Sequence, residues 1–456
     1  MTRDVIVVGS ASAVNAALQH DQIADLHIVG AVVIGPGETN VPTLAHAATW
    51  HSLKLEDCTA QAILLAEPPP NGAAARAVLE RAAAAGLKVL LLEQSGVRAL
   101  RLDDLLGTPL GDVDWARIRD MIAGKRVLIT GGGGSIGGEL ARRIAGLAPD
   151  RLTLLDSSEH NLYQIGLELR DARTVLCDIR DEAAVRRWFA KETPQIVCHT
   201  AALKQVPVVE AFPGEGVLTN ICGLKHVAEA AHWVGADVIF VSTDKAVEPS
   251  GVMGATKRFG ELFCQALDRR GGRRAIPVRL GNVLGSAGSV APLFEAQLAA
   301  GGPLTVTHAD MTRYFLSIPQ AADALLQAAA KGLASQRRGA AKVIEMGEAL
   351  RVVELARSVI RLAGKRPDED VPIVFTGLRP GEKMHEQLVA SDEWPESDVG
   401  SGVIAAMSQP RDLSELHDLI ERLALLARQG DDNGVREAVF AAINGGDETE
   451  ELAAAG

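Results

Sequence analysis

The sequence predicts an α/β protein in which parallel strands alternate with helices, and two observations support this class. Short apolar runs recur along most of the chain, and alanine-rich stretches with helical character separate them. Turns rich in glycine and polar residues follow several of these runs directly, as they do where parallel strands end at a ligand-binding edge. With 456 residues the chain exceeds the usual size of one compact domain, so we expect two or three domains.

Composition narrows the classes of function. A formal net charge of -12 argues against a nucleic-acid partner. The five cysteines are scattered without a CxxC pair, so we predict buried thiols in a reducing compartment and no metal site. No window holds about 18 uncharged apolar residues, the length that a membrane-spanning helix needs. We therefore expect a cytoplasmic protein without membrane insertion.

Residues 1–105 predict a small parallel α/β domain. We expect strands at 4–8, 26–34, 62–65 and 88–92 and a helix at 73–85. The first turn keeps only Gly9 of the pattern G-x-G-x-x-G, because Ala11 and Val14 stand where the later glycines would be. This disfavours close approach of a pyrophosphate. We interpret the domain as structural or regulatory, with ligand binding as the alternative.

Three further ranges complete the predicted organisation. They are a linker with one helix at 106–124, a larger α/β unit at 125–410 whose substrate-binding region lies mainly at 281–400, and a C-terminal segment at 411–456. In the last segment, leucine and isoleucine spacing predicts a helix over 411–428. From residue 431 onward there are seven acidic residues and one arginine, which predicts a solvated acidic tail.

The larger unit begins with a glycine-rich turn. A strand at 126–129 runs into Gly131, Gly134 and Gly137 at three-residue spacing, and a helical stretch follows. Glycines there allow a tight turn and close approach to a pyrophosphate, while the helix N-terminus favours negative charge. The turn therefore predicts a doubly wound Rossmann-type sheet that binds a dinucleotide.

The second strand of this unit, 151–155, ends in Asp156. A carboxylate at this position can accept hydrogen bonds from the adenosine ribose hydroxyls, and it would repel a 2′-phosphate. We therefore predict NAD as the cofactor in preference to NADP.

Later strand ends add candidates for the cofactor site, and two of them leave alternatives open. Asp178 could meet the adenine or cap a helix. Small Ala201 and Ala202 would leave room for the cofactor. Asn220 could bond the backbone of a neighbouring strand or be a surface amide.

The stretch 241–257 carries a serine, a threonine, a carboxylate and two lysines behind the apolar run 236–241. That run predicts a buried parallel strand, so the polar cluster lies at its carboxyl end. Met253 and Lys257 are four residues apart and would share one face of a helix. The stretch could supply an acid, a base and a lysine that holds the cofactor; the alternative is a solvated loop.

A second polar turn, 281–292, follows the strand predicted at 275–280. Its glycines, serines and Asn282 could donate to a substrate diphosphate, or the turn could be structural. Arg313, Arg379 and Lys383 are candidate contacts to an anionic nucleotide, with ordinary surface charge as the alternative.

Residues 125–390 resemble the extended short-chain dehydrogenase/reductases, and more narrowly the UDP-N-acetylhexosamine 4,6-dehydratases of bacterial capsular-polysaccharide biosynthesis. Eight motifs in order carry the resemblance: 130–137 (TGGGGSIG), 155–163 (LDSSE and NLY), 201–207 (AALKQVP), 242–245 (STDK), 253–257 (MGATK), 279–286 (RLGNVLGS), 311–315 (MTRYF) and 377–383 (GLRPGEK). Residues 1–120 resemble the family's N-terminal Rossmann-like domain less specifically. The long members begin with membrane-spanning helices that have no match in this sequence.

The resemblance implies a reaction on UDP-N-acetylglucosamine. The sugar is oxidised at C4 by hydride transfer to NAD, loses water across C5 and C6, and receives the hydride at C6. Position by position, Thr243 would bond the C4 oxygen, Asp244 would protonate the C6 hydroxyl, Lys245 would remove the C5 proton and Lys257 would hold the nicotinamide ribose. A homo-oligomer is also implied.

The motifs that match the family place the remaining site residues. Expected cofactor contacts are Thr130, Gly131, Gly134, Ser135, Ile136, Gly137, Asp156, Ser157, Asp178, Ile179, Ala201, Ala202, Lys204, Asn220, Ser242 and Lys257. Expected substrate contacts are Lys204, Asn282, Ser286, Ser289, Val290, Pro292, Arg313, Arg379 and Glu382.

Two features of the expected catalytic group leave the mechanism open. Asp244 would have to be protonated and Lys245 neutral, opposite to their ordinary states; burial favours this and their adjacency opposes it. Met253 stands where most short-chain dehydrogenases carry a tyrosine, and a thioether cannot accept a proton. The family includes a branch with methionine here, and a relay through Thr243 or Ser242 and water toward Lys257 could replace the tyrosine.

Two other functions remain as rivals. A UDP-sugar C4- or C5-epimerase would share the first oxidation, whereas elimination additionally needs the acid assigned to Asp244. A non-catalytic NAD-binding regulatory or scaffold protein would explain Met253 and the degenerate first turn. The C5 stereochemistry, the sugar epimer accepted and the oligomeric state are not predicted.

Overall fold

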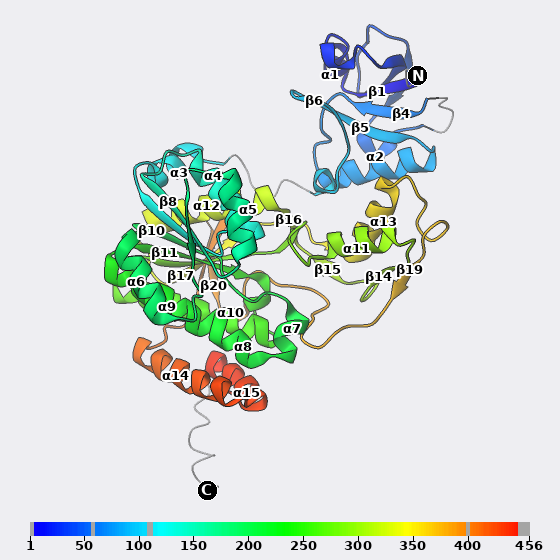
Figure 1. Cartoon of the computed structure of the whole chain (residues 1–456). Helices are drawn as coiled ribbons and strands as arrows, with labels where there is room; N and C mark the ends of the chain where they lie inside the picture. Colours follow the sequence, from blue (N-terminus) through cyan, green and yellow to red (C-terminus); the bar gives the residue numbers. More distant parts are fainter. Residues whose placement is uncertain (1–3, 56–59, 107–112, 398–401, 446–456) are drawn as a thin grey trace. The chain divides into compact units, whose positions relative to one another are not determined.

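The computed structural model of the protein describes residues 4–55, 60–106, 113–397 and 402–445, shown in Figure 1. Contacts between residues divide the chain into two compact units. The first unit comprises residues 1–108, 289–312 and 347–377, and the second comprises residues 109–288, 313–346 and 378–456. The sequence-based ranges 1–105 and 125–410 follow different boundaries and remain proposals.

The first unit contains a six-stranded sheet in the order β3-β2-β1-β4-β5-β6. Its strands are β1 (Asp4–Gly9), β2 (His27–Ile34), β3 (Thr43–Ala47), β4 (Ala62–Leu65), β5 (Lys88–Glu93) and β6 (Gly96–Ala99). All neighbours pair in parallel except β5 and β6, which form an antiparallel edge. The sequence correctly predicted the four strands buried in the centre and did not predict β3 or β6.

Helices and a small second sheet complete this unit. The elements are α1 (Ala11–Ala17), α2 (Gly72–Ala84), α11 (Val290–Ala299), α13 (Val352–Leu362), and the parallel pair β14 (Leu304–Val306) and β19 (Ile373–Phe375). Leu362 of α13 packs against the apolar cluster around β1 and α2. Arg361 of α13 pairs with Glu80 of α2 at 3.1 Å. These contacts explain why residues 347–377 group with the N-terminal sheet.

The second unit contains a nine-stranded sheet in the order β20-β21-β17-β12-β11-β10-β7-β8-β9. Its strands are β7 (Arg126–Thr130), β8 (Arg151–Asp156), β9 (Arg173–Leu176), β10 (Ile196–His199), β11 (Asp237–Thr243), β12 (Ala275–Leu280), β17 (Ala340–Ile344), β20 (Trp394–Ser397) and β21 (Val403–Met407). The six neighbouring strands β9, β8, β7, β10, β11 and β12 pair in parallel, and this is the strand order of the Rossmann fold. β17 adds in parallel, and β21 and β20 add in antiparallel.

Helices cover both faces of this sheet because successive strand residues point to opposite sides. Val197 and Phe240 belong to one apolar cluster, and Cys198 and Ile239 belong to the other. The first cluster includes α6 (Glu182–Glu192), α9 (Gly223–Val234) and α10 (Val252–Arg270); the second includes α3 (Trp115–Ile122), α4 (Ser135–Ala145), α5 (Glu159–Glu168) and α12 (Ile318–Ala334). The predicted α/β class with a doubly wound parallel sheet is confirmed.

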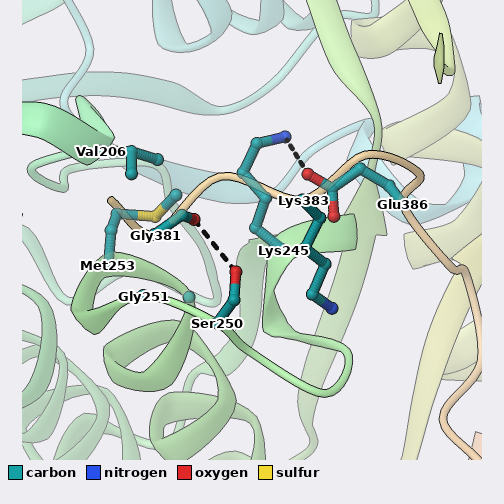
Figure 2. A pocket seen from close by; sticks show the side chains of 9 residues that line it. Val206, Lys245, Ser250, Gly251, Met253, Gly381, Lys383 and Glu386 are labelled. Atoms are coloured by element: carbon teal, nitrogen blue, oxygen red, sulfur yellow. Dashed lines mark hydrogen bonds and ion pairs between the residues drawn. The ribbon is translucent and has the colours of Figure 1, made fainter. Parts of the chain in front are cut away.

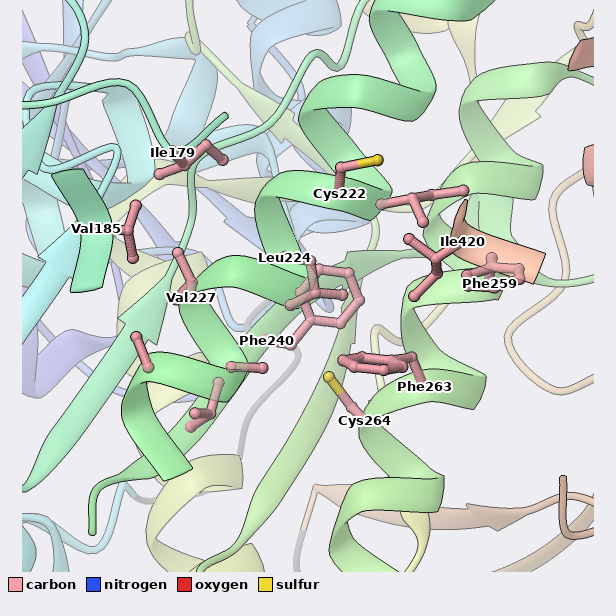
Figure 3. Packing of buried hydrophobic residues seen from close by; sticks show 14 of the residues in the cluster. Ile179, Val185, Cys222, Leu224, Val227, Phe240, Phe259, Phe263, Cys264 and Ile420 are labelled. Carbon is pink, nitrogen blue, oxygen red and sulfur yellow. The ribbon is translucent and has the colours of Figure 1, made fainter. Parts of the chain in front are cut away.

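Shorter elements connect the sheet to its helices. They are α7 (Val206–Ala211), α8 (Pro213–Val217), a π-helical turn at Leu218–Cys222, a 3-10 turn at Asp244–Ala246, and the parallel pair β13 (Asn282–Leu284) and β16 (Phe315–Ser317). Figure 3 shows the packing around Phe240, Phe259 and Phe263, into which the free thiols of Cys222 and Cys264 fit as small apolar groups. Cys58 lies outside the described residues.

Two C-terminal helices pack on the same cluster. α14 (Leu413–Gln429) matches the predicted helix, and α15 (Asp432–Asn444) lies where a solvated tail was expected. Val435 and Val439 of α15 are fully buried, and α15 contacts α10. The prediction of a tail from residue 431 was therefore wrong, because apolar side chains on one face of α15 outweigh its acidic character. Residues 446–456 lie outside the described residues.

Over the described ranges, none of the helices combines the length and the apolar character that a membrane span requires.

Candidate active site

The glycine-rich turn after β7 is shaped by close backbone contacts. Gly131 adopts φ 67°, and a Cβ there would lie 2.8 Å from the backbone nitrogen of Ala201. Only glycine fits such a position without strain. Helix α4 then starts after Gly134, which provides no side-chain cap, so the amides of its first turn point toward the turn without a side-chain acceptor. This geometry can receive a pyrophosphate.

Asp156 at the end of β8 is fixed next to this turn. Its Oδ2 accepts a hydrogen bond from the Gly133 amide at 3.0 Å, and its Oδ1 accepts one from the Ser158 amide at 2.9 Å. Each carboxylate oxygen keeps a further lone pair, so Asp156 could also accept from ribose hydroxyls. The turn, α4 and Asp156 together fit a dinucleotide.

Other predicted cofactor residues have structural partners. Thr130 and His199 are both buried, and the Thr130 hydroxyl lies 2.7 Å from His199 Nδ1. Ser135 Oγ accepts from the Ala287 amide at 3.2 Å. Ile136, Ala201 and Ala202 are half-buried, Gly137 is buried, and Ser157 is exposed.

Asp178 does not cap a helix. The N-cap of α6 is Asp181, whose side chain accepts from the Ala184 amide. Asp178 instead pairs with Arg180 at 2.7 Å, and hydrogen bonds from Arg180 lower the pKa of Asp178. The capping alternative is therefore wrong, because Asp181 is the residue that directly precedes the helix.

Asn220 resolves the other open alternative. It is buried, its Oδ1 accepts from the Leu203 amide at 2.8 Å, and its Nδ2 donates to the Leu203 carbonyl at 3.0 Å. Asn220 therefore bonds the backbone just beyond β10 and is not a surface amide. Ile179 is also buried, and it packs against Gly223.

The strand β11 delivers the cluster expected to carry the chemistry. Lys245 Nζ donates to Asp244 Oδ1 at 2.9 Å, so the two adjacent side chains form an ion pair. The Thr243 hydroxyl donates to the same oxygen at 2.9 Å. Asp244 is fully buried, and its Oδ2 has no hydrogen-bond partner among the described residues. One oxygen of the acid is thus engaged and the other is available.

Lys245 lies between three acceptors. Besides Asp244, it donates to Asn282 Oδ1 at 2.8 Å and lies 3.6 Å from Glu386 Oε1. The Lys245 side chain is 23% exposed, whereas that of Glu386 is 2% exposed. A substrate could therefore reach the amine of Lys245.

Lys257 is held deeper in the site. Its Nζ donates to the Val241 carbonyl at 3.0 Å and lies 4.8 Å from the ring centroid of Phe240. Burial lowers the pKa of Lys257 to about 8. Burial also lowers the pKa of His199 to about 3, and the charge of Lys257 acts in the same direction.

A small open pocket lies beside Lys245 and Met253. Its other lining residues are Val206, Ser250, Gly251, Gly254, Gly381, Lys383 and Glu386. In the view of Figure 2, Met253 and Glu386 lie on opposite sides of the pocket with Lys245 between them. The side chain at the usual tyrosine position therefore faces the same space as the acid–base group.

The predicted substrate residues are brought together only in part. Lys204 Nζ donates to Ser286 Oγ at 3.1 Å. Arg313 donates to the carbonyls of Lys383 and Met384, which orders the segment that follows Gly381. Lys383 itself donates to the Val247 carbonyl at 2.7 Å.

The other substrate candidates have separate positions. Arg379 is exposed, and its amide donates to Glu382 Oε2 at 3.2 Å. Ser289, Val290 and Pro292 belong to the other compact unit, at the start of α11.

Sequence reasoning missed a buried ionic network behind the pocket. Arg279 is fully buried and donates to Glu261 and Glu393, with distances of 2.6 to 2.8 Å. Arg258 also donates to Glu393 at 2.6 Å. Burial raises the pKa of Glu393, but the hydrogen bonds and charge of Arg279, the charge of Arg258 and the Ala390 amide together outweigh burial and lower it to about 2. The network ties the segment after Glu386 to α10 and β12.

Sequence reasoning also missed Glu386. It stands at the end of a segment that the sequence marked only for its basic residues, so no spacing rule singled it out. An acid that follows shortly after Lys383 in a predicted substrate-binding region was the only signal.

The strand order, the glycine-rich turn and the polar groups at the carboxyl edge define a Rossmann-type α/β protein with a site at that edge. A sequence profile described as "Polysaccharide biosynthesis protein" matches residues 127–406. The chain therefore belongs to the polysaccharide biosynthesis protein family.

Three known proteins are similar to this chain. The probable polysaccharide biosynthesis protein EpsC of Bacillus subtilis is 40% identical over 367 residues, covering 77% of this chain and 59% of EpsC. The UDP-glucose 4-epimerase of Rickettsia akari is 32% identical over 319 residues, covering 67% of this chain and 90% of the epimerase. The solved structure of Pen from Bacillus thuringiensis superposes with a TM-score of 0.57 at 29% identity, covering 66% of this chain and 98% of Pen. The chain thus spans about three fifths of the length of EpsC.

Proposed function

We propose that the protein is an NAD-dependent 4,6-dehydratase that converts UDP-N-acetylglucosamine to the UDP-4-keto-6-deoxy sugar. The observation that carries the proposal is the Asp244–Lys245 pair, in which one oxygen of the acid has no partner in the described ranges and the amine lines a pocket. Elimination of water needs both an acid and a base, and this pair supplies them side by side.

The first requirement is a place for NAD. The turn at Gly131, the uncapped start of α4 and the carboxylate of Asp156 would hold the pyrophosphate and the adenosine ribose. Lys257 would contact the nicotinamide ribose. When bound, NAD accepts the C4 hydride and later returns it to C6.

The ion pair can supply the forms that elimination needs. Transfer of one proton along the 2.9 Å hydrogen bond turns the ammonium of Lys245 into an amine and the carboxylate of Asp244 into an acid. The amine then removes the C5 proton, which the C4 ketone has made acidic, and Asp244 protonates the departing C6 hydroxyl.

The remaining polar groups have roles in binding. Thr243 lies beside Asp244 and would orient the C4 oxygen. Asn282 fixes Lys245, and Ser286 with Lys204 offers donors for the diphosphate. Arg379 and Glu382 remain candidates for the nucleotide, and Ser289, Val290 and Pro292 for the diphosphate turn.

A second candidate function has a specific observation in its favour. The chain covers 90% of the Rickettsia akari UDP-glucose 4-epimerase at 32% identity. An epimerase returns the hydride to C4, so it needs no acid for a C6 hydroxyl. Asp244 beside Lys245 favours the dehydratase.

Incubation of the purified protein with UDP-N-acetylglucosamine and mass spectrometry of the product tests the proposal. Loss of one water from the nucleotide sugar is the expected result. An isomer of unchanged mass would support the epimerase instead, and no turnover would support a binding role without catalysis. Sedimentation of the same preparation would test the homo-oligomer that we also propose.

A further inference from the structure

Met253 leaves the first step of the proposed reaction without a proton acceptor, because the C4 hydroxyl must lose its proton as it becomes a ketone. The acceptor must be a titratable group that faces the pocket beside Met253. Among the residues that line this pocket, Lys245, Lys383 and Glu386 carry titratable side chains. Lys383 donates to the Val247 carbonyl, and the proposed elimination already assigns Lys245 to the C5 proton, so Glu386 is the remaining group.

Glu386 has the features of the missing acceptor. Its side chain is 2% exposed, and its Oε1 lies 3.6 Å from Lys245 Nζ and 3.7 Å from Arg313 Nε. Its Oε2 is buried and has no hydrogen-bond partner among the described residues. A buried carboxylate oxygen without a partner is costly, and a hydroxyl donated by a bound ligand would satisfy it.

The groups that a relay would use are engaged elsewhere. The Thr243 hydroxyl already donates to Asp244, and Lys257 Nζ donates to the Val241 carbonyl. The Ser242 hydroxyl is buried and has no hydrogen-bond partner within the part of the chain that the structure describes, and Ser242 does not line the pocket. Glu386 is therefore better placed than this relay.

We propose that Glu386 is a further catalytic residue, the general base that takes the proton of the C4 hydroxyl. The inference rests on the proposed function. The O–H bond breaks and its proton goes to Glu386 Oε2. The electron pair of that bond forms the C4 carbonyl, while the C4 hydrogen would leave with the electron pair of the C4–H bond as hydride to the oxidised nicotinamide.

The position of Lys245 completes the proton balance. In one turnover Glu386 gains a proton from the C4 hydroxyl, and Asp244 loses one to the departing water. The C5 proton taken by Lys245 returns to C5 when the hydride reaches C6. Lys245 lies between Asp244 Oδ1 at 2.9 Å and Glu386 Oε1 at 3.6 Å, so it can pass the proton from Glu386 to Asp244 and restore both groups.

The ionic network behind the pocket explains how Glu386 is held. Glu393 accepts from Arg279 and Arg258, and its Oε2 also accepts from the Ala390 amide. Arg313 orders the same segment from its other end through the Lys383 and Met384 carbonyls. The segment that carries Glu386 is thus fixed on both sides of it.

Single-turnover absorbance of the NAD-loaded protein tests the assignment, because reduced nicotinamide absorbs where the oxidised form does not. Asp244→Asn should still reduce its nicotinamide on mixing with UDP-N-acetylglucosamine, since only elimination is blocked. Glu386→Gln should reduce it at least about 100-fold more slowly, as expected for loss of a general base. Asp392→Asn, an exposed carboxylate in the same segment, is the matched control and should behave as wild type.

A binding measurement supplies a readout independent of turnover. Calorimetry with wild type should show that UDP-N-acetylglucosamine binds about tenfold more tightly than its 4-deoxy analogue, because a charge-assisted hydrogen bond is lost. In Glu386→Gln the ratio should fall to about threefold or less. Nicotinamide reduction by Glu386→Gln at the wild-type rate, or an unchanged binding ratio, would overturn the assignment. Failure of wild type to act on any UDP-sugar would instead overturn the proposed function.

Discussion

In each of the two parallel sheets, a turn connects the first strand in sequence to a helix. The two turns differ in whether their polar groups are already paired. In the first sheet, the Ser10 amide donates to Glu67 Oε1 at 2.7 Å, and the Ser10 side chain caps α1. In the second, α4 starts at Gly134 without a side-chain cap, and Asp156 binds the turn from the neighbouring strand. In the first turn the Ser10 amide and the start of α1 already have side-chain acceptors, whereas the amides at the start of α4 remain as donors for an anion.

The same contrast extends along the two carboxyl edges. In the second sheet Lys257 is buried with a lowered pKa, and Asp244, Glu386 and Ser242 each keep a buried oxygen without a partner among the described residues. In the first sheet Glu67 is only half-buried and is hydrogen-bonded. Unsatisfied groups at a sheet edge are costly to folding, so they mark the edge that binds and reacts.

The largest effect should come from placing a side chain in the glycine-rich turn after β7. Gly131→Ala forces a side chain onto a positive φ and toward the Ala201 backbone, which costs about 1–3 kcal/mol in stability and displaces the pyrophosphate. Protein purified with this change should contain no NAD. Gly9→Ala is the matched change in the first turn and should leave the NAD content unaltered; equal NAD content in both variants would remove the distinction between the turns.

Removal of the acid should have the next largest effect. Asp244→Asn should lower the rate of water loss by about 10²–10⁴-fold because the C6 hydroxyl then leaves unprotonated. NAD content and the affinity for UDP-N-acetylglucosamine should stay near wild type. Product mass spectrometry measures the first quantity and calorimetry the second. Undiminished water loss would exclude Asp244 from the mechanism.

The buried lysine should make stability depend on pH. The pKa of Lys257 is about 8 when folded and about 10.5 when unfolded, so the unfolded chain binds more protons between these values and stability rises with pH there. The gain amounts to about 3 kcal/mol. Comparison with Lys257→Met over pH 7.5 to 10.5 isolates it, because other groups cancel. A constant difference in the free energy of unfolding would show that Lys257 is solvated.

The smallest effect should follow a change in the first turn. Glu67→Gln weakens the hydrogen bond to the Ser10 amide and should cost about 1 kcal/mol of stability. Turnover and NAD content should not change. A loss of turnover with intact folding would indicate that the first sheet takes part in the reaction.

Much of the fold was readable because central parallel strands are buried on both faces. The run at Ala275–Leu280 forms β12 with the predicted bounds, and the glycine spacing identified the turn before α4. Strands β3 and β6 were not predicted because both lie at sheet edges and their residues are less buried and less apolar than those of the central strands. Helix α15 was not predicted because the acidic residues of this segment indicated a solvated tail, although Val435 and Val439 form an apolar face.

The site was predictable only where its residues are close in sequence. The stretch from Thr243 to Lys257 was identified as one cluster, although pairing between Asp244 and Lys245 depends on side-chain torsions that the sequence does not specify. Glu386 and the partners of Arg279 reach the site from distant segments. Arg313 and Lys383 were expected to meet a nucleotide, whereas both donate hydrogen bonds to backbone carbonyls.

The most direct test follows one hydrogen. UDP-N-acetylglucosamine deuterated at C4 is incubated with the protein in ordinary water, and the product is examined by NMR. The deuterium should appear at C6 of a product that has lost water, because the hydride removed at C4 is returned at C6. Deuterium retained at C4 of an isomer, or lost to solvent, would contradict this mechanism.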